Sequence, residues 1–131
     1  MFDFDISGVS LLPNGPDEAR IKDLLRLSFS SAGIESGHVA VEVVEETRIT
    51  ELNSEHRGLD KATDVLSFPV DGVDATVGPR ELGDIVLCPP YCESVDRAIV
   101  HGALHLVGMD HEVDSGEMLA LEAEILRWAA Q

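Results

Sequence analysis

Three histidines lie close together in the run His101-Gly-Ala-Leu-His105-Leu-Val-Gly108-Met-Asp-His111. Histidines at positions i and i+4 share one face of a helix, so His101 and His105 are expected to point the same way. Gly108 can end that helix in a left-handed conformation and bring His111 back toward the first two. Three converging imidazoles suit tetrahedral zinc and leave its fourth position for water. The run predicts one Zn²⁺ ion held by His101, His105 and His111.

The spacing of these histidines equals that of the metzincin peptidase signature H-E-x-x-H-x-x-G-x-x-H, except that Gly102 replaces the glutamate. In the peptidases this glutamate takes a proton from the attacking water. Glycine cannot move a proton, so the reaction must draw its base from the metal-lowered pKa of water or from another group. The alternative is a helix whose histidines only cap carbonyls or lie half-buried.

Hydrophobic periodicity indicates which elements position this site. Alternating apolar residues predict strands at 2–6 and 39–43, and two apolar runs predict strands at 65–69 and 82–88. Helical spacing predicts a helix from Pro16 to Gly33 and a short one that Thr47 caps and Gly58 ends. Pro69 and Pro79 indicate that one of the later strands lies at a sheet edge.

Two further helices complete the pattern. One runs from about Tyr91 to Val107 and carries the first two histidines, and the last begins at a capping box of Asp114 and Glu117 and turns Trp128 inward. The order strand, helix, strand, helix, strand, strand, helix, helix predicts an α+β fold. We expect a small mixed sheet of about four strands packed with helices, one of them a zincin-like metal-binding helix. Residues 1–131 are expected to form a single domain.

Composition narrows the setting of the protein. Two cysteines, Cys88 and Cys92, are too few for a secreted disulfide framework, and the acidic start lacks the pattern of a signal peptide. No stretch is long and apolar enough to span a membrane. We therefore expect a cytoplasmic protein with two unlinked thiols and no membrane partner.

The net charge of −16 repels phosphate backbones at long range. A nucleic-acid enzyme with this charge needs local compensation. Five of the nine basic residues fall between the second strand and the histidines: Arg48, Arg57, Lys61, Arg80 and Arg97. That distribution permits a basic patch, while an acid-rich, lysine-poor surface also suits a salty cytoplasm.

Several blocks of the sequence resemble one family. They are Leu52-Asn53-x-x-x-Arg57-Gly58-x-x-x-x-Thr63-Asp64-Val65-Leu66-Ser67-Phe68-Pro69, Gly83-Asp84-Ile85-Val86-Leu87-Cys88 and His101-Gly-x-Leu-His105-Leu-x-Gly108-x-Asp110-His111. In this order they are similar to the YbeY family of bacterial rRNA-maturation endoribonucleases. The family usually has a further helix before the histidine helix, and here only a few residues fill that interval.

The resemblance implies a zinc-dependent, single-strand-specific endoribonuclease. It would act in 16S rRNA 3′-end maturation and ribosome quality control, with an rRNA precursor and small ribosomal subunit components as partners and no DNA. The metal ligands would be His101, His105 and His111, and the functional arginine would be Arg57. On chemistry alone, Arg57 could grip a phosphate or could be an ordinary surface arginine paired with an acid.

Other residues near the motifs leave alternatives open. We expect His56 to be solvated, and the period of a strand places Asp64 and Ser67 on opposite faces. Asp110 could orient a ligand imidazole or cap the turn, and Glu112 is a candidate base.

Two rival functions follow from the same residues. A metal-dependent hydrolase of a non-RNA substrate would need an acid in place of the missing glutamate. A non-catalytic assembly factor with structural zinc would need a fourth protein ligand, for which Cys92, Cys88 and His38 are the options.

Overall fold

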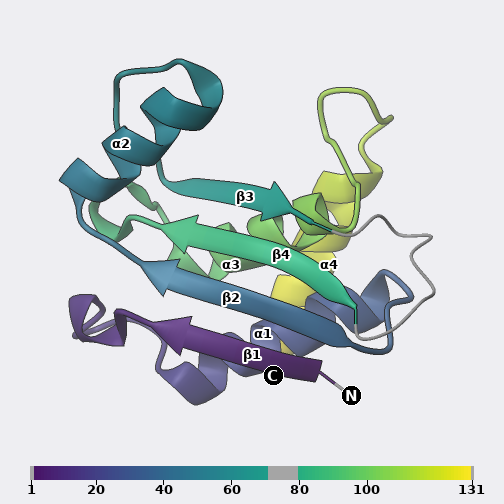
Figure 1. Ribbon diagram of the computed structural model, residues 1–131. Helices are drawn as coiled ribbons and strands as arrows, with labels where there is room; N and C mark the ends of the chain where they lie inside the picture. Colours follow the sequence, from purple (N-terminus) through teal and green to yellow (C-terminus); the bar gives the residue numbers. More distant parts are fainter. Residues whose placement is uncertain (1, 71–79, 131) are drawn as a thin grey trace.

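The computed structural model describes residues 2–70 and 80–130 and is built on one mixed sheet. Its strands are β1 (Phe2–Ser7), β2 (Gly37–Val43), β3 (Val65–Pro69) and β4 (Glu81–Leu87), in the order β1-β2-β4-β3 (Figure 1). β2 pairs in parallel with both β1 and β4, and β3 runs antiparallel to β4. This confirms the predicted α+β fold with a small mixed sheet.

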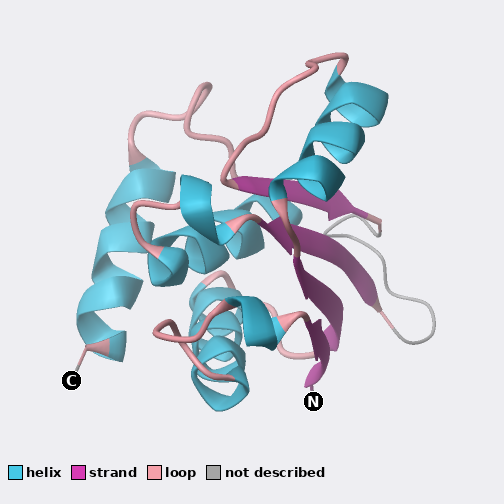
Figure 2. Ribbon diagram, turned by 90° about the vertical axis from the view of Figure 1, so that its left-hand side faces the viewer, coloured by secondary structure: helices cyan, strands magenta, loops and turns pink. Residues whose placement is uncertain are grey.

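The helices cover the two faces of the sheet unequally. The main core lies between one face and the helices α1 (Glu18–Ser31), α3 (Val95–Leu106) and α4 (Glu117–Ala129). α2 (Glu46–Arg57) packs on the other face, over β3 and β4 (Figure 2). The smaller core there consists of Val44, Ile49, Leu52, Leu66, Val86 and Cys88. Within the described residues, no helix is both long and apolar enough to cross a bilayer.

β3 is an edge strand, and its hydrogen bonds define which backbone groups face outward. The Cys88 N–H donates to the Asp64 carbonyl (2.9 Å) and the Val70 N–H to the Leu82 carbonyl (3.2 Å). In an antiparallel pair this pattern turns the backbone groups of Val65, Ser67 and Pro69 away from β4. The missing N–H of Pro69 therefore falls on the unpaired side, as predicted for an edge strand. Pro79 lies outside the described residues.

Two predicted helix starts were wrong. α2 begins at Glu46 after Glu45, so Thr47 lies within its first turn and does not cap it. α3 begins at Val95 rather than near Tyr91, because Pro89–Tyr91 forms a separate 3₁₀ turn, η2. The Ser94 hydroxyl accepts the Arg97 N–H (3.2 Å), which satisfies a free donor of the first turn of α3.

The final helix begins close to the predicted place. Asp114 accepts N–H groups of Gly116 and Met118 (2.8 and 2.9 Å), and Glu117 accepts that of Ser115 (2.7 Å). The N-cap of α4 is Gly116 rather than Asp114, so the predicted capping box was wrong, although both carboxylates still accept N–H groups at the start of the helix.

Trp128 is 45% exposed, so its predicted place in the core was wrong. It lies in the last turn of α4, where Arg20 of α1 donates to the Ala129 carbonyl (2.6 Å). This turn extends beyond the buried face formed by Met118 and Ile125.

Candidate metal centre

The end of α3 positions the histidine run. The Gly108 N–H donates to the His105 carbonyl (3.0 Å) and the Met109 N–H to that of Leu104 (3.1 Å), the two bonds of a Schellman motif. Gly108 adopts the predicted left-handed conformation, with φ of 94°. The chain therefore reverses directly after the helix and carries His111 back over its last turn.

The three imidazoles converge on one point. One ring nitrogen from each of His101, His105 and His111 lies within 4.8 Å of the other two, and the Nε2 atoms of His101 and His105 are 3.1 Å apart. Two nitrogens on tetrahedral zinc lie about 3.3 Å apart, given Zn–N bonds of about 2.0–2.1 Å. The first two rings already have this spacing, and a small movement of His111 completes the set. The residues fit a zinc ion, and this group could hold a metal.

The surroundings of His105 favour its neutral form. Burial, together with the neighbouring His101, lowers the pKa of His105 below its ordinary value, although a backbone hydrogen bond with Met109 opposes the shift. A neutral imidazole keeps the lone pair that a metal needs.

Glu122 of α4 contacts the Nδ1 atom of His101 and was missed in the sequence analysis. Its Oε1 lies 2.7 Å from His101 Nδ1, and its Oε2 accepts from Arg97 Nε (2.9 Å). Burial alone would raise the pKa of Glu122, but the hydrogen bonds with His101 and Arg97 outweigh it and lower the pKa. The sequence signal was partial: Glu122 occupies the apolar face of the helix together with Met118 and Ile125, which indicates burial but not its partner.

Gly102 faces the sheet. A Cβ on Gly102 would lie 3.0 Å from Ile85 Cγ2 and 3.2 Å from Ser67 Oγ, and that hydroxyl donates to the Gly102 carbonyl (3.2 Å). Glycine therefore allows α3 to approach β3 and β4 closely. A glutamate here would meet the strands directly.

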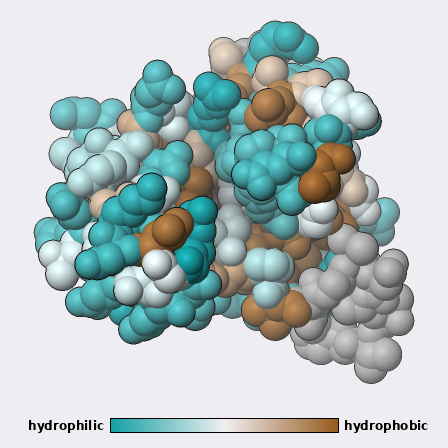
Figure 3. All heavy atoms as spheres, turned by 90° about the horizontal axis from the view of Figure 1, so that it is seen from above, coloured by the Kyte–Doolittle hydropathy of each residue, from teal (hydrophilic) through white to brown (hydrophobic). Residues whose placement is uncertain are grey.

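A cleft of about 650 Å³ opens beside the histidines. It follows the free edge of β3 and is lined by all three imidazoles on one side and by the end of α2 on the other. Figure 3 shows the surface hollowed between α2 and the loop after α3, with hydrophilic side chains on both walls.

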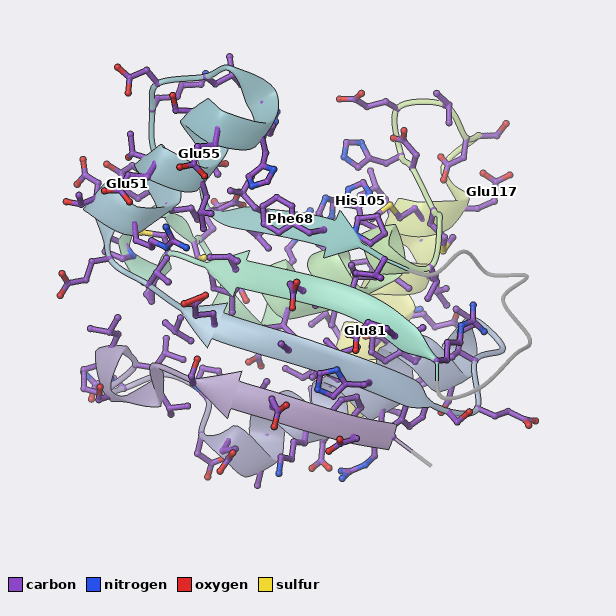
Figure 4. All side chains as sticks on the ribbon, viewed as in Figure 1. Glu51, Glu55, Phe68, Glu81, His105 and Glu117 are labelled. Atoms are coloured by element: carbon purple, nitrogen blue, oxygen red, sulfur yellow. The ribbon has the colours of Figure 1, made fainter. Side chains whose placement is uncertain are left out.

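Arg57 and His56 both line the cleft from the end of α2. Among the described residues Arg57 has no hydrogen-bond or ion-pair partner, so it is not held by an acid. Gly58 ends α2 with φ of 69°, as predicted. His56 is exposed, as expected, and its ring centroid also lies 4.7 Å from that of Phe68. Figure 4 shows Phe68 on β3 toward α2 and His105 farther along toward the loop after α3.

The polar residues next to the motifs have separate local partners. Asp64 precedes β3 and accepts the Val65 N–H (2.8 Å), so strand periodicity does not apply to it, and both Asp64 and Ser67 line the cleft. Asp110 accepts the Glu112 N–H (2.9 Å) and so caps the turn. Glu112 also lines the cleft, and its carboxylate has no hydrogen-bond partner among the described residues.

The three suggested fourth ligands lie outside the histidine group. Among residues 2–70 and 80–130, no cysteine lies close enough to join the group formed by His101, His105 and His111. Both thiols are free, as expected, and burial raises the pKa of Cys92 to about 11, so it remains protonated. His38 contacts Asp5 and Glu81 instead. The described residues therefore offer no closed four-ligand shell.

Three of the five basic residues have different surroundings. Arg57 lines the cleft, whereas Arg97 lines a second cavity of about 320 Å³ that shares His101, His111 and Asp64 with it. Arg48 pairs with Glu51 on α2 (3.5 Å). Arg57 is the one lysine or arginine among the described residues that line the main cleft, so local compensation of the negative charge there depends on it.

Comparisons with known proteins place these features in a family context. The profile of the family described as Endoribonuclease YbeY matches residues 16–129. The chain is 42% identical over 97 residues to Endoribonuclease YbeY of Sulfurimonas denitrificans, an alignment that covers 65% of this chain and 67% of that protein. It is 33% identical over 120 residues to that of Persephonella marina, covering 80% and 78%.

A solved structure is also similar. The solution structure of TM1509 from Thermotoga maritima superposes with a TM-score of 0.58 at 28% identity, covering 98% of this chain and 89% of that one. In the present chain only residues 88–94 connect β4 to α3, and their one helical turn is η2.

Proposed function

The chain belongs to the YbeY family of endoribonucleases, and from this premise we propose that it is zinc-dependent and cuts single-stranded RNA in the cleft beside β3. Family membership itself makes the protein an RNA endonuclease and a hydrolase. The proposal extends to 16S rRNA 3′-end maturation and ribosome quality control in the cytoplasm, with small ribosomal subunit components as partners. We treat residues 1–131 as one catalytic domain.

One observation carries the proposal. Three histidines with ring nitrogens within 4.8 Å of one another line the same cleft as Arg57, which has no hydrogen-bond or ion-pair partner among the described residues. A phosphodiester is an anion that gains charge during cleavage, so it needs positive groups on both sides. This arrangement suits phosphoryl transfer better than cleavage of a peptide or a neutral ester.

Arg57 binds the phosphate in this scheme. Its guanidinium can donate two parallel hydrogen bonds to the phosphoryl oxygens and offset the charge that develops there. His101, His105 and His111 would hold the zinc ion. When bound, that ion polarises a phosphoryl oxygen and lowers the pKa of water.

The nucleophile is either water or the neighbouring 2′-hydroxyl of RNA. Glu112 is the carboxylate best placed to accept its proton, because Asp64 and Asp110 are already engaged with backbone N–H groups. Single strands are favoured because a cleft of about 650 Å³ admits a strand with its bases splayed out, which a duplex does not offer.

The decisive experiment compares three nucleic acids of one sequence. Zinc-loaded protein should cut single-stranded RNA, with little cleavage of the RNA duplex or of single-stranded DNA. The matched control is His105→Ala prepared in the same way. Cleavage by the wild type that does not exceed that of His105→Ala would overturn the proposal, and bound zinc without cleavage would favour the assembly-factor alternative.

A further inference from the structure

Glu122 is a buried acid outside the family motifs quoted above. It is 2% exposed and lies on the inner face of α4, where Met118 and Ile125 are completely buried. Burying a carboxylate costs several kcal/mol unless it is paired and hydrogen-bonded. Its two partners, His101 and Arg97, should therefore explain its presence.

The two carboxylate oxygens of Glu122 have different partners. Oε1 lies 2.7 Å from His101 Nδ1, and Oε2 lies 2.9 Å from Arg97 Nε. An arginine only donates, so it occupies one oxygen as a permanent hydrogen-bond donor. The other oxygen is left to accept, which places the shared proton on His101 Nδ1. The Nε2 atom of His101 is then unprotonated, and it is the atom that lies 3.1 Å from His105 Nε2.

Arg97, His101 and His105 are spaced four residues apart along α3 and so lie on one face of the helix. Glu122 contacts the first two and thereby ties α4 to two successive turns of α3. The side chain of Arg97 is 56% exposed and lines the second cavity. Through Arg97 and His101, Glu122 therefore links that cavity to the three histidines.

We infer that Glu122 is the positioning residue of the metal centre. It fixes the tautomer and ring orientation of His101, and Arg97 holds the carboxylate in place. This inference rests on the proposed zinc site but not on RNA cleavage. Carboxylates that orient a metal-bound histidine change metal affinity by about 10- to 100-fold when they are replaced.

The test is zinc affinity without RNA, measured by competition with a chelator. Glu122→Gln has one acceptor oxygen for two donors and should bind zinc about 10- to 100-fold more weakly than the wild type. Glu124→Gln removes an acid of the same helix that has no partner among the described residues and should leave the affinity unchanged. Equal zinc affinity in the two variants would overturn the inference.

Two further measurements test the inference even if the Glu122→Gln variant does not fold. Nitrogen-15 NMR of the metal-free wild type should show His101 protonated at Nδ1, and protonation at Nε2 instead would overturn the inference. Arg97→Ala changes a largely exposed side chain and should weaken zinc binding by less than about 10-fold, below the range for loss of the orienting carboxylate. A wild type that binds zinc as expected but cuts no RNA would sink the proposed function alone.

Discussion

The two walls of the cleft are built in different ways. On the histidine wall, His101 contacts Glu122, the His105 carbonyl accepts the Gly108 N–H, and Gly102 allows the helix to lie close to the sheet. On the α2 wall, Arg57 has no partner among the described residues and comes from a helix with the smaller core. A metal needs groups fixed before it arrives, whereas an arginine that receives a flexible phosphate chain gains from freedom to adjust. The comparison predicts that damage to the two walls has different signatures.

The largest effect is expected from the histidine wall. His101→Ala removes one nitrogen of the three, and bound zinc should fall from one ion per chain to almost none, with loss of RNA cleavage. Metal analysis after dialysis measures this. His56 lines the same cleft from α2, so His56→Ala is the matched control and should retain its zinc. Similar zinc loss in both variants would break the distinction between the walls.

Arg57→Ala should lower the cleavage rate by about 10²- to 10³-fold, the usual loss for one charge-stabilising donor. Zinc content and the midpoint of thermal unfolding should not change, because Arg57 supports no other described residue. Arg57→Lys should recover only part of the rate, since an ammonium lacks the two-pronged geometry. Loss of zinc in Arg57→Ala would contradict the independence of the two walls.

A smaller effect is expected where the histidine wall packs on the sheet. Gly102→Ala places a methyl group 3.0 Å from Ile85 Cγ2 and should lower the free energy of unfolding by about 1–3 kcal/mol. Gly102→Glu should be more destabilising and should not raise cleavage, although it restores the peptidase signature. Denaturant unfolding and RNA cleavage test this pair. A stable Gly102→Glu with increased activity would show that position 102 faces the cleft.

The smallest effect involves a histidine outside the cleft. Hydrogen bonds with Asp5 and Glu81 raise the pKa of His38, whereas burial lowers that of His105. A raised pKa adds stability that is fully present below the unfolded value of about 6.5 and is lost as the pH rises through the folded value.

His38→Gln should therefore reduce stability near about pH 6 and match the wild type near about pH 9. Thermal unfolding at both values measures this, and NMR titration should show His38 losing its proton at higher pH than His105. A uniform loss of stability across pH would show that His38 acts by packing alone.

Much of the architecture was predictable because periodicity reports burial. Val39, Val41 and Val43 alternate into the main core, and β3 and β4 lie where the apolar runs placed them. Helix starts were less predictable, because side chains compete to cap. Ser94 caps α3, which begins at Val95 rather than near Tyr91, and Thr47 has no capping role.

The convergence of the three histidines was predictable because all three belong to one local run. Glu122 was not, since its contact with His101 joins α4 to α3 and no local pattern encodes that packing. The same applies to His56 and Phe68, which meet only after α2 folds over β3. For Trp128 the sequence predicted burial that the structure does not have. Helical spacing says which face of the helix a residue is on, but not whether the core extends to that turn.

The outward edge of β3 has little left with which to bind another strand. Of its three outward-facing positions, Val65 has its N–H taken by the Asp64 carboxylate and Pro69 has none, so Ser67 alone offers a donor. A neighbouring chain that tried to extend the sheet would find a broken ladder. The cleft can therefore remain open to solvent at an unpaired strand without inviting edge-to-edge aggregation.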